Sequence, residues 1–310
     1  MKILFLCYSL VVSIAIADLT NQKKDRDRWE ILQRAIESGG IRAAFDMFRS
    51  KSIEPILVKG WAAGRFYPTD VFRSTSDIDL AVATGDFDAA FALCRASKMQ
   101  GLPIDLHREL RHFDTLSWQN LVANSHLVDL DGSEIRVLRP EDHLRVLAVH
   151  WLTDGGWFRD RLWDIYYAIE NRPIGFDWDR CLNSVSQVRR RWIICVIGLA
   201  HKYFDLNIDD LPFSNEAKDL PRWLIRAVER EWASGVRLLP LYRHTNDLSG
   251  FLKQVKKRLP PNPIHATVDM EGSFDAAIRI HYQIGTIAKR IGPSIKKLFI
   301  SKLAQKKQNG

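Results

Sequence analysis

The sequence predicts an α+β fold, in which a mixed β-sheet with flanking helices is followed by an all-helical C-terminal domain. Short apolar runs of strand character occur at 55–60, 77–83 and 102–110, and an alternating pattern spans 126–138. After Pro140 the pattern changes to helical periodicity without alternating runs. With 310 residues and 46% hydrophobic content, the chain has room for two domains with a substantial core.

The first elements are helical. Residues 25–50 show helical spacing, and we expect the helix to be interrupted at Gly39 and Gly40, because glycine weakens helices. The apolar run 55–60 follows as a short strand that ends in glycine. The next residues predict a helical turn that stops before Pro68, since the residue preceding proline disfavours the helical conformation.

The later elements complete the sheet. Apolar residues at helical spacing after Gly85 predict a helix that returns the chain for the strand at 102–110. Asp131 and Gly132 lie between two alternating runs, which is a strong signal of a β-hairpin. We therefore expect a mixed α/β domain at 21–140 and a helical domain with a basic tail at 141–310.

The first 20 residues form an apolar leader. Lys2, the apolar run 3–17 and the Ala15-Ile16-Ala17 ending resemble a secretory signal peptide, and the run is short for a permanent membrane span. Export and an upstream start codon both explain this segment. No other stretch is apolar and long enough to cross a membrane.

The composition limits the classes of function. The net charge of +8 and the pI near 9.3 favour polyanionic partners, although a solvated basic face is the preferred explanation for the lysine-rich tail alone. The four cysteines have no CxxC spacing, which argues against a zinc site and against a disulfide framework. Reduced thiols, as in the cytoplasm, fit this pattern.

Three aspartates suggest a metal site. Asp77 and Asp79 are one residue apart, so in a strand both side chains project from the same face. Asp105, in the next predicted strand, can join them. Like charges at this spacing repel unless a cation lies between them, and Mg²⁺ or Mn²⁺ bound to carboxylates and phosphate oxygens satisfies that requirement. A loop cap and a solvated strand edge are the structural alternative.

Residues beside the aspartates suit a phosphate. Lys59 carries a positive charge, and Gly60 at the start of a helical turn allows backbone amides to approach a phosphate closely. Arg73, Ser74 and Ser76 add charge and donors in the loop before Asp77. Each of these signals is weak alone, whereas their order along the chain is more specific.

This order resembles the polymerase-β-like nucleotidyltransferase superfamily, and more closely a group of uncharacterised nucleotidyltransferase-like proteins. The similarity covers about residues 50–185 and rests on these segments: ILVKGWAAGRFYP, RSTSDIDLAV, IDLH, VLRPEDHLRVLAVH and RLWDIYYAI. The superfamily's usual Gly-Ser or Gly-Gly is here Lys59-Gly60-Trp61. The resemblance implies transfer of a nucleoside monophosphate from an NTP to an acceptor hydroxyl, with release of pyrophosphate.

The resemblance also implies residue roles. Asp77 and Asp79 would hold a nucleotide-bound Mg²⁺, and Asp105 would help to hold a second ion. Lys59 and Arg73 would neutralise the β- and γ-phosphates, while the backbone at Gly60 and the Ser76 hydroxyl would donate hydrogen bonds.

Four further residues are candidates for the acceptor side: His107, His150, Arg161 and Asp164. A plain sheet histidine is as good an explanation for His107, and a local salt bridge is the preferred one for Arg161 and Asp164. The acceptor is open and includes a small molecule, a peptide, a protein or RNA.

Two other function classes compete with the enzyme. One is a catalytically silent protein of the same fold that acts as a binding or regulatory partner, for example in a toxin–antitoxin-like pair. The other is a secreted binding protein with a genuine leader. Because the expected reaction consumes NTP, it favours the cytoplasm.

Overall fold

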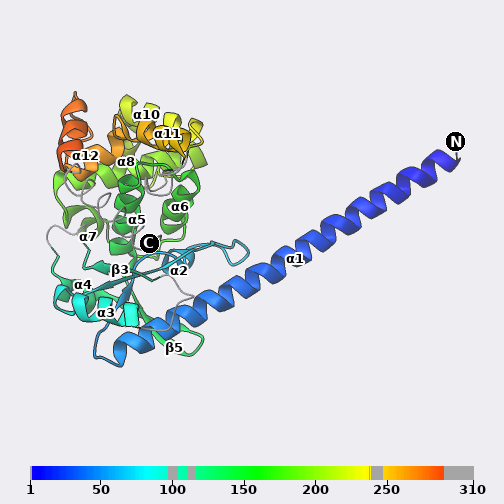
Figure 1. The fold of residues 1–310 in the computed structure, drawn as a ribbon, viewed down its shortest axis with the longest axis horizontal. Helices are drawn as coiled ribbons and strands as arrows, with labels where there is room; N and C mark the ends of the chain where they lie inside the picture. Colours follow the sequence, from blue (N-terminus) through cyan, green and yellow to red (C-terminus); the bar gives the residue numbers. More distant parts are fainter. Residues whose placement is uncertain (1, 97–103, 111–115, 237, 239–246, 290–310) are drawn as a thin grey trace, which may run out of the picture. The chain divides into compact units, whose positions relative to one another are not determined.

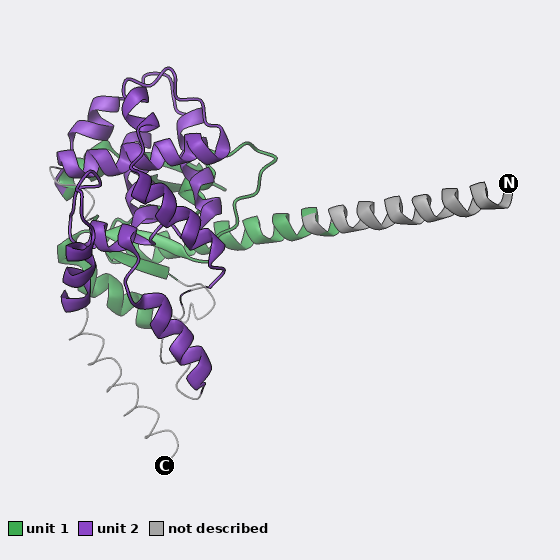
Figure 2. Ribbon diagram, turned by 90° about the horizontal axis from the view of Figure 1, so that it is seen from above, with its two compact units in different colours: residues 1–110, 118–138 green, residues 111–117, 139–310 purple. Residues whose placement is uncertain are grey.

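A computed structural model describes residues 2–96, 104–110, 116–236, 238 and 247–289, without the side chains of 2–24 and 26. It confirms an α+β fold with a mixed five-stranded sheet. The chain divides into two compact units, coloured separately in Figure 2: unit 1 comprises Met1–Leu110 and Trp118–Leu138, and unit 2 comprises Arg111–Ser117 and Arg139–Gly310. The side chains of the apolar leader and the whole of the basic tail beyond residue 289 lie outside the described part.

Unit 1 contains the sheet (Figure 1). Its strands are β1 (Ile56–Leu57), β2 (Ile78–Val82), β3 (Ile104–Arg108), β4 (His126–Leu130) and β5 (Ser133–Val137). They lie in the order β3-β2-β1-β5-β4. β2 is parallel to β3 and β1 to β5, whereas β1 is antiparallel to β2 and β4 to β5. β3 and β4 therefore form the two edges.

α1 (Lys2–Arg49) precedes the sheet, and the strands are connected by helices and turns: α2 (Trp61–Gly64), the 3₁₀ turn Thr84–Asp86, α3 (Phe87–Ala96) and α4 (Trp118–Asn124). The last turns of α1 bury Phe45 and Phe48 in one cluster with Leu80 of β2 and Ile135 of β5. Burial of two phenylalanine side chains supplies several kcal/mol, about 2 for each. α1 is thereby fixed to the sheet.

The predicted break at Gly39 and Gly40 is wrong, because α1 continues through both glycines. Gly40 is buried, and Ile41 and Phe45 immediately after it belong to the core cluster. Glycine costs a helix about 1 kcal/mol relative to alanine. Packing of the apolar residues that follow outweighs that local preference.

The predicted hairpin is confirmed. β4 and β5 pair antiparallel, with Leu130 opposite Ser133, and the two residues between them, Asp131 and Gly132, have φ angles of 50° and 84°. Positive φ at both central positions gives a turn whose twist matches that of the flanking strands. The Asp-Gly pair fits this turn because both residue types tolerate positive φ.

Among its described residues, unit 2 contains helices and connecting turns but no strand. Its elements are α5 (Pro140–Thr153), the 3₁₀ turn Arg159–Arg161, α6 (Leu162–Glu170), α7 (Trp178–Asn183), α8 (Gln187–Phe204), α9 (Ser214–Lys218), α10 (Arg222–Ala233), α11 (Leu248–Arg258) and α12 (Pro263–Asp269), with 280–289 also helical. α5 and α8 supply much of its core. Among the described helices, none has both the length and the apolar character that a bilayer crossing requires.

Candidate metal and nucleotide site

The register of two parallel strands builds the centre of the site. β2 and β3 pair with Asp79 beside Asp105, and two residues further on Ala81 lies beside His107. Residues paired in a parallel ladder point to the same side of the sheet, and so do residues two apart along one strand. The pairing therefore places Asp79, Asp105 and His107 on one face of the sheet. The sequence predicts this for Asp79 and Asp105.

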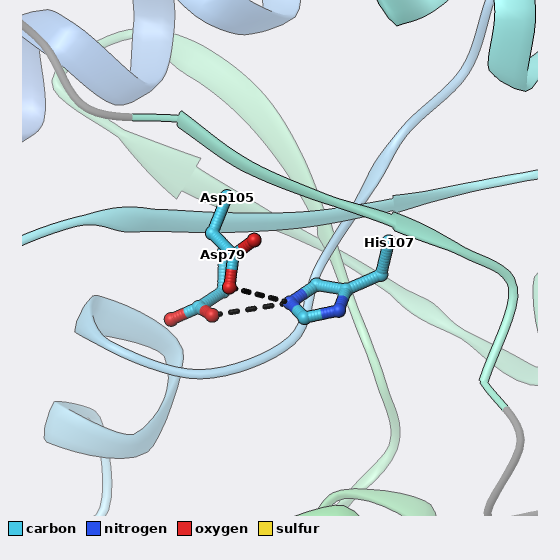
Figure 3. Close-up of side chains that lie close together, drawn as sticks. All are labelled: Asp79, Asp105 and His107. Atoms are coloured by element: carbon cyan, nitrogen blue, oxygen red, sulfur yellow. Dashed lines mark hydrogen bonds and ion pairs between the residues drawn. The ribbon is translucent and has the colours of Figure 1, made fainter. Parts of the chain in front are cut away.

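The three side chains converge (Figure 3). Nε2 of His107 lies 3.2 Å from Oδ1 of Asp79 and 3.4 Å from Oδ2 of Asp105. One potential ligand atom from each residue lies within 4.8 Å of the others. The exposed fraction of the side chain rises from 6% at Asp79 through 32% at His107 to 54% at Asp105. The group thus runs from the interior to the surface.

Lys59 is part of the same group. Its Nζ forms an ion pair with Oδ1 of Asp79, and both side chains are buried. Burial raises the pKa of the Asp79 carboxyl, but the hydrogen bond with His107 and the charge of Lys59 outweigh burial and hold that pKa below its ordinary value. The repulsion expected between neighbouring carboxylates is therefore relieved by a cation, and this cation is the lysine ammonium.

Asp77 lies outside the group. Among the described residues, the only set of three or more potential ligands within 4.8 Å of one another is Asp79, Asp105 and His107. Asp77 precedes the first residue of β2 and sits in a bend, where its Oδ1 accepts a hydrogen bond of 3.1 Å from the Ser76 hydroxyl. The same-face rule holds only for extended residues, so it does not apply at this bend.

The turn after β1 has the properties expected at Gly60. This residue has φ 58° and ψ −123°, a backbone conformation that residues with a Cβ rarely adopt. The space beside it is occupied by the segment before β2: a Cβ at Gly60 would lie 3.5 Å from the Asp77 carbonyl oxygen and 3.5 Å from Cγ2 of Thr75. α2 begins directly after this glycine, but with four residues it is a single turn.

The candidate phosphate donors lie along that segment. Ser74 and Ser76 are exposed, and Arg73 is half-buried with its Cβ 3.7 Å from the position that a Cβ on Gly64 would take. Arg73 therefore lies beside Gly64 at the end of α2, and Ser74 and Ser76 flank Thr75, which lies beside the Gly60 turn. Lys59 differs from the expectation in that its ammonium contacts a carboxylate of the site.

Two carboxylates and one imidazole make a donor set that fits a divalent cation. Oxygen ligands suit Mg²⁺ and Mn²⁺, and imidazole extends the set towards Mn²⁺ and other transition metals. The exposed Asp105 leaves solvent access on one side, as required for an ion that also contacts a substrate. Asp79, Asp105 and His107 are thus the residues that could hold an ion.

The candidate acceptor residues of the helical region belong to unit 2. Nε2 of His150 lies 3.5 Å from Oδ2 of Asp154, one helical turn further along. Asp164 is buried at 4% exposure in α6, and Arg161 is half-buried immediately before that helix. Within unit 2 these positions are compatible with local packing.

Sequence reasoning missed two residues near the site. Oγ1 of Thr75 donates a hydrogen bond of 2.6 Å to Oε1 of Glu37 in α1. Thr75 lies inside the RSTSDID motif, but its partner is 38 residues away and belongs to a helix without any motif. Only the folded structure reveals this contact.

No protein-family model matches the chain, and no curated protein matches it significantly.

Proposed function

We propose that the chain is a metal-dependent nucleotidyltransferase, which transfers a nucleoside monophosphate from an NTP to an acceptor hydroxyl and releases pyrophosphate. The observation that carries the proposal is the in-register pair of Asp79 and Asp105, with His107 between their carboxylates, beside a glycine turn with positive φ. A pair of carboxylates that holds a divalent ion beside a phosphate-binding segment is the arrangement such a reaction uses.

The bond changes are simple. The acceptor oxygen attacks the α-phosphorus, the bond from that phosphorus to the bridging oxygen breaks, and the electron pair leaves with pyrophosphate. The acceptor proton passes to solvent or to a nearby base. Catalysis then consists of positioning the two reactants and stabilising negative charge.

The residues divide these tasks. Asp79, Asp105 and His107 would hold the divalent ion, which would neutralise phosphate charge and lower the pKa of the bound hydroxyl. Arg73, Ser74 and Ser76 would contact the polyphosphate, and the side chains of Ser74 and Ser76 are exposed. Asp77 stands at the entrance to β2, next to the Gly60 turn.

The decisive experiment combines ion binding with transfer. We expect the wild-type protein to bind Mn²⁺, measured by electron paramagnetic resonance, and to attach label from one of the four α-labelled NTPs to itself, to RNA or to a small metabolite. Asp105→Asn should weaken Mn²⁺ binding at least tenfold and abolish transfer, because it removes a ligand.

Asp88→Asn is the matched control. Asp88 is an exposed aspartate of unit 1, and it pairs with Arg108 of β3 through a contact of 3.1 Å. This variant should keep both Mn²⁺ binding and transfer. Wild-type protein that binds neither Mn²⁺ nor any NTP would refute the proposal.

A catalytically silent binding protein is the second candidate. The ion pair between Lys59 and Asp79 supports it, because the lysine already neutralises the buried carboxylate without a metal. A silent protein would bind NTP in a calorimetric titration, and the nucleotide would be recovered unchanged after prolonged incubation with Mn²⁺ and candidate acceptors. Turnover of any NTP excludes this candidate.

The remaining features bear on substrate and location. The proposed acceptor is a hydroxyl of a small molecule, a peptide, a protein or RNA. Consumption of NTP favours the cytoplasm, whereas the leader at 1–20 favours export. N-terminal sequencing of the mature protein separates the two, since export predicts removal of that leader.

A further inference from the structure

The segment between α2 and β2 carries most of the candidate nucleotide contacts. Residues 71–77 belong to no helix or strand. A segment of this kind has no ladder of backbone hydrogen bonds to hold it, so side-chain contacts must offset the entropy of ordering it. The contacts that fix it therefore determine where Arg73, Ser74 and Ser76 lie.

One side of the segment is held by α1. Thr75 donates its hydroxyl to Glu37, and the guanidinium of Arg34 lies 5.1 Å from the centre of the Phe72 ring. Arg34 and Glu37 are three residues apart in α1, so they lie on the same face of the helix. α1 thus contacts the segment at two points, one turn apart.

The other side of Thr75 faces the glycine turn. A Cβ added at Gly60 would lie 3.5 Å from the methyl carbon Cγ2 of Thr75, so this methyl group lies beside the turn. The Asp77 carbonyl oxygen lies at the same distance from that position. Thr75 therefore joins three parts of unit 1: its hydroxyl meets α1, its methyl group meets the Gly60 turn, and its backbone leads into β2.

Charge strengthens this arrangement. Burial raises the pKa of the Glu37 carboxyl, and the Thr75 hydrogen bond together with the charges of Arg73 and Arg34 opposes that rise. Glu37 therefore interacts with two members of the segment, Thr75 by a hydrogen bond and Arg73 through its charge. Glu37 and Thr75 do not belong to the group formed by Asp79, Asp105 and His107.

We infer that Glu37 and Thr75 are positioning residues for a nucleotide polyphosphate: they hold the segment 73–77 against the Gly60 turn, so that Arg73, Ser74 and Ser76 face the phosphates. The inference rests on the proposed function for the identity of the ligand. The metal ligands lie on β2 and β3, which are held by their own ladder. Nucleotide affinity and metal affinity should consequently respond differently to substitution.

Thr75→Val tests this directly, because it removes the hydroxyl and keeps the shape. We expect the dissociation constant of a fluorescent ATP analogue to rise about three- to tenfold, the effect of one lost hydrogen bond. The dissociation constant for Mn²⁺ alone should stay unchanged. Thr75→Ser, which retains the hydroxyl, should restore most of the nucleotide affinity.

Glu37→Ala should reproduce the effect of Thr75→Val from the other partner, in a helix where alanine is well tolerated. Ser50→Ala is the matched control, since its hydroxyl bonds the Met47 carbonyl at 2.8 Å, outside the segment. Unchanged nucleotide affinity in Thr75→Val would overturn the inference. So would an equal loss of Mn²⁺ affinity, which indicates a general structural defect.

Hydrogen exchange separates this inference from the proposed function. If the wild-type protein binds no nucleotide, the proposed function fails, and amide exchange at residues 74–77 still decides whether Glu37 and Thr75 hold the segment. Faster exchange there in both Thr75→Val and Glu37→Ala supports the positioning role. Exchange equal to that of the wild type refutes it.

Discussion

Each unit contains a cluster of buried charge, and the two clusters differ in exposure. In unit 2, the side chains of Arg145 and Asp142 are 0% and 1% exposed, and Arg180 completes the cluster at 14%. Oδ1 of Asp142 accepts bonds of 2.6 Å from Arg145 and 3.1 Å from Arg180, and its Oδ2 accepts one of 2.6 Å from Arg180. Both oxygens of this carboxylate have protein donors.

The cluster of unit 1 is open by contrast. Asp79 is buried and paired with Lys59, but Asp105 is more than half exposed and its contact with His107 is 3.4 Å long. A buried cluster in which every carboxylate oxygen accepts a hydrogen bond has a structural role. A cluster whose members become more exposed towards the surface leaves carboxylate oxygens available to a ligand. Exposure of its outermost member therefore separates a candidate site from a structural ion cluster.

Breaking the closed cluster should have the largest effect on stability. Asp142→Asn leaves the guanidinium groups of Arg145 and Arg180 close together without a carboxylate. We expect the free energy of unfolding of the full chain to fall by about 3–5 kcal/mol in urea titrations. A variant with the wild-type midpoint would show that the cluster of unit 2 is not architectural.

Asp79→Asn should affect both stability and binding. It leaves the Lys59 ammonium buried without its carboxylate, so we expect a loss of about 3 kcal/mol in urea unfolding as well as loss of Mn²⁺ binding. The double variant Lys59→Met with Asp79→Asn should recover part of the stability but none of the Mn²⁺ affinity. Full stability in the single variant would contradict the importance of this ion pair.

Two glutamates should give opposite pH dependences of stability. Burial raises the pKa of Glu141, but the amide of Asp177 and the guanidinium of Arg139 outweigh burial and lower that pKa. Its contribution is present above the pKa of an unfolded glutamate, about 4.3, and is lost as the pH falls through the lower folded value. The difference in unfolding midpoint between the wild type and Glu141→Gln should therefore shrink on acidification.

Glu37 has the opposite sign, since its folded pKa is raised. Its contribution is fully present below about pH 4.3 and is lost as the pH rises through the higher folded value. Glu37→Gln should thus gain stability relative to the wild type as the pH rises through that window. Urea midpoints across acidic and neutral pH measure both glutamates, and a shared sign would contradict these assignments.

The smallest effect should come from an exposed ion pair. Asp209 contacts Nζ of Lys218 at 2.7 Å, and its side chain is 76% exposed. Solvent screens such pairs, so Asp209→Asn should leave the urea midpoint unchanged. A clear shift of the urea midpoint would mean that the exposure of an ion pair does not determine its contribution to stability.

Local patterns predicted much of the sheet and half of the site. Alternation and the Asp-Gly turn indicated the hairpin, and the two-residue period placed Asp105 and His107 on one face of β3. The same period failed at Asp77, because the apolar pattern does not show at which residue β2 begins. Local propensity also failed at Gly39 and Gly40, where distant packing decides the conformation.

Contacts between remote segments were beyond prediction. The ion pair of Lys59 with Asp79 depends on how β1 pairs with β2, and the bond from Thr75 to Glu37 depends on where α1 packs. A motif identifies residue types in order along the chain. It contains no information about which cation reaches which carboxylate.

The parallel pairing of β2 with β3 makes the site an all-or-none property of the fold. A slip of one residue would bring Ile104 or Leu106 beside Asp79 and turn Asp105 to the opposite side of the sheet. A slip of two residues would return Asp105 to the same side of the sheet but would place it beside Asp77 or Ala81 instead of Asp79. The site therefore depends on this one alignment of the two strands.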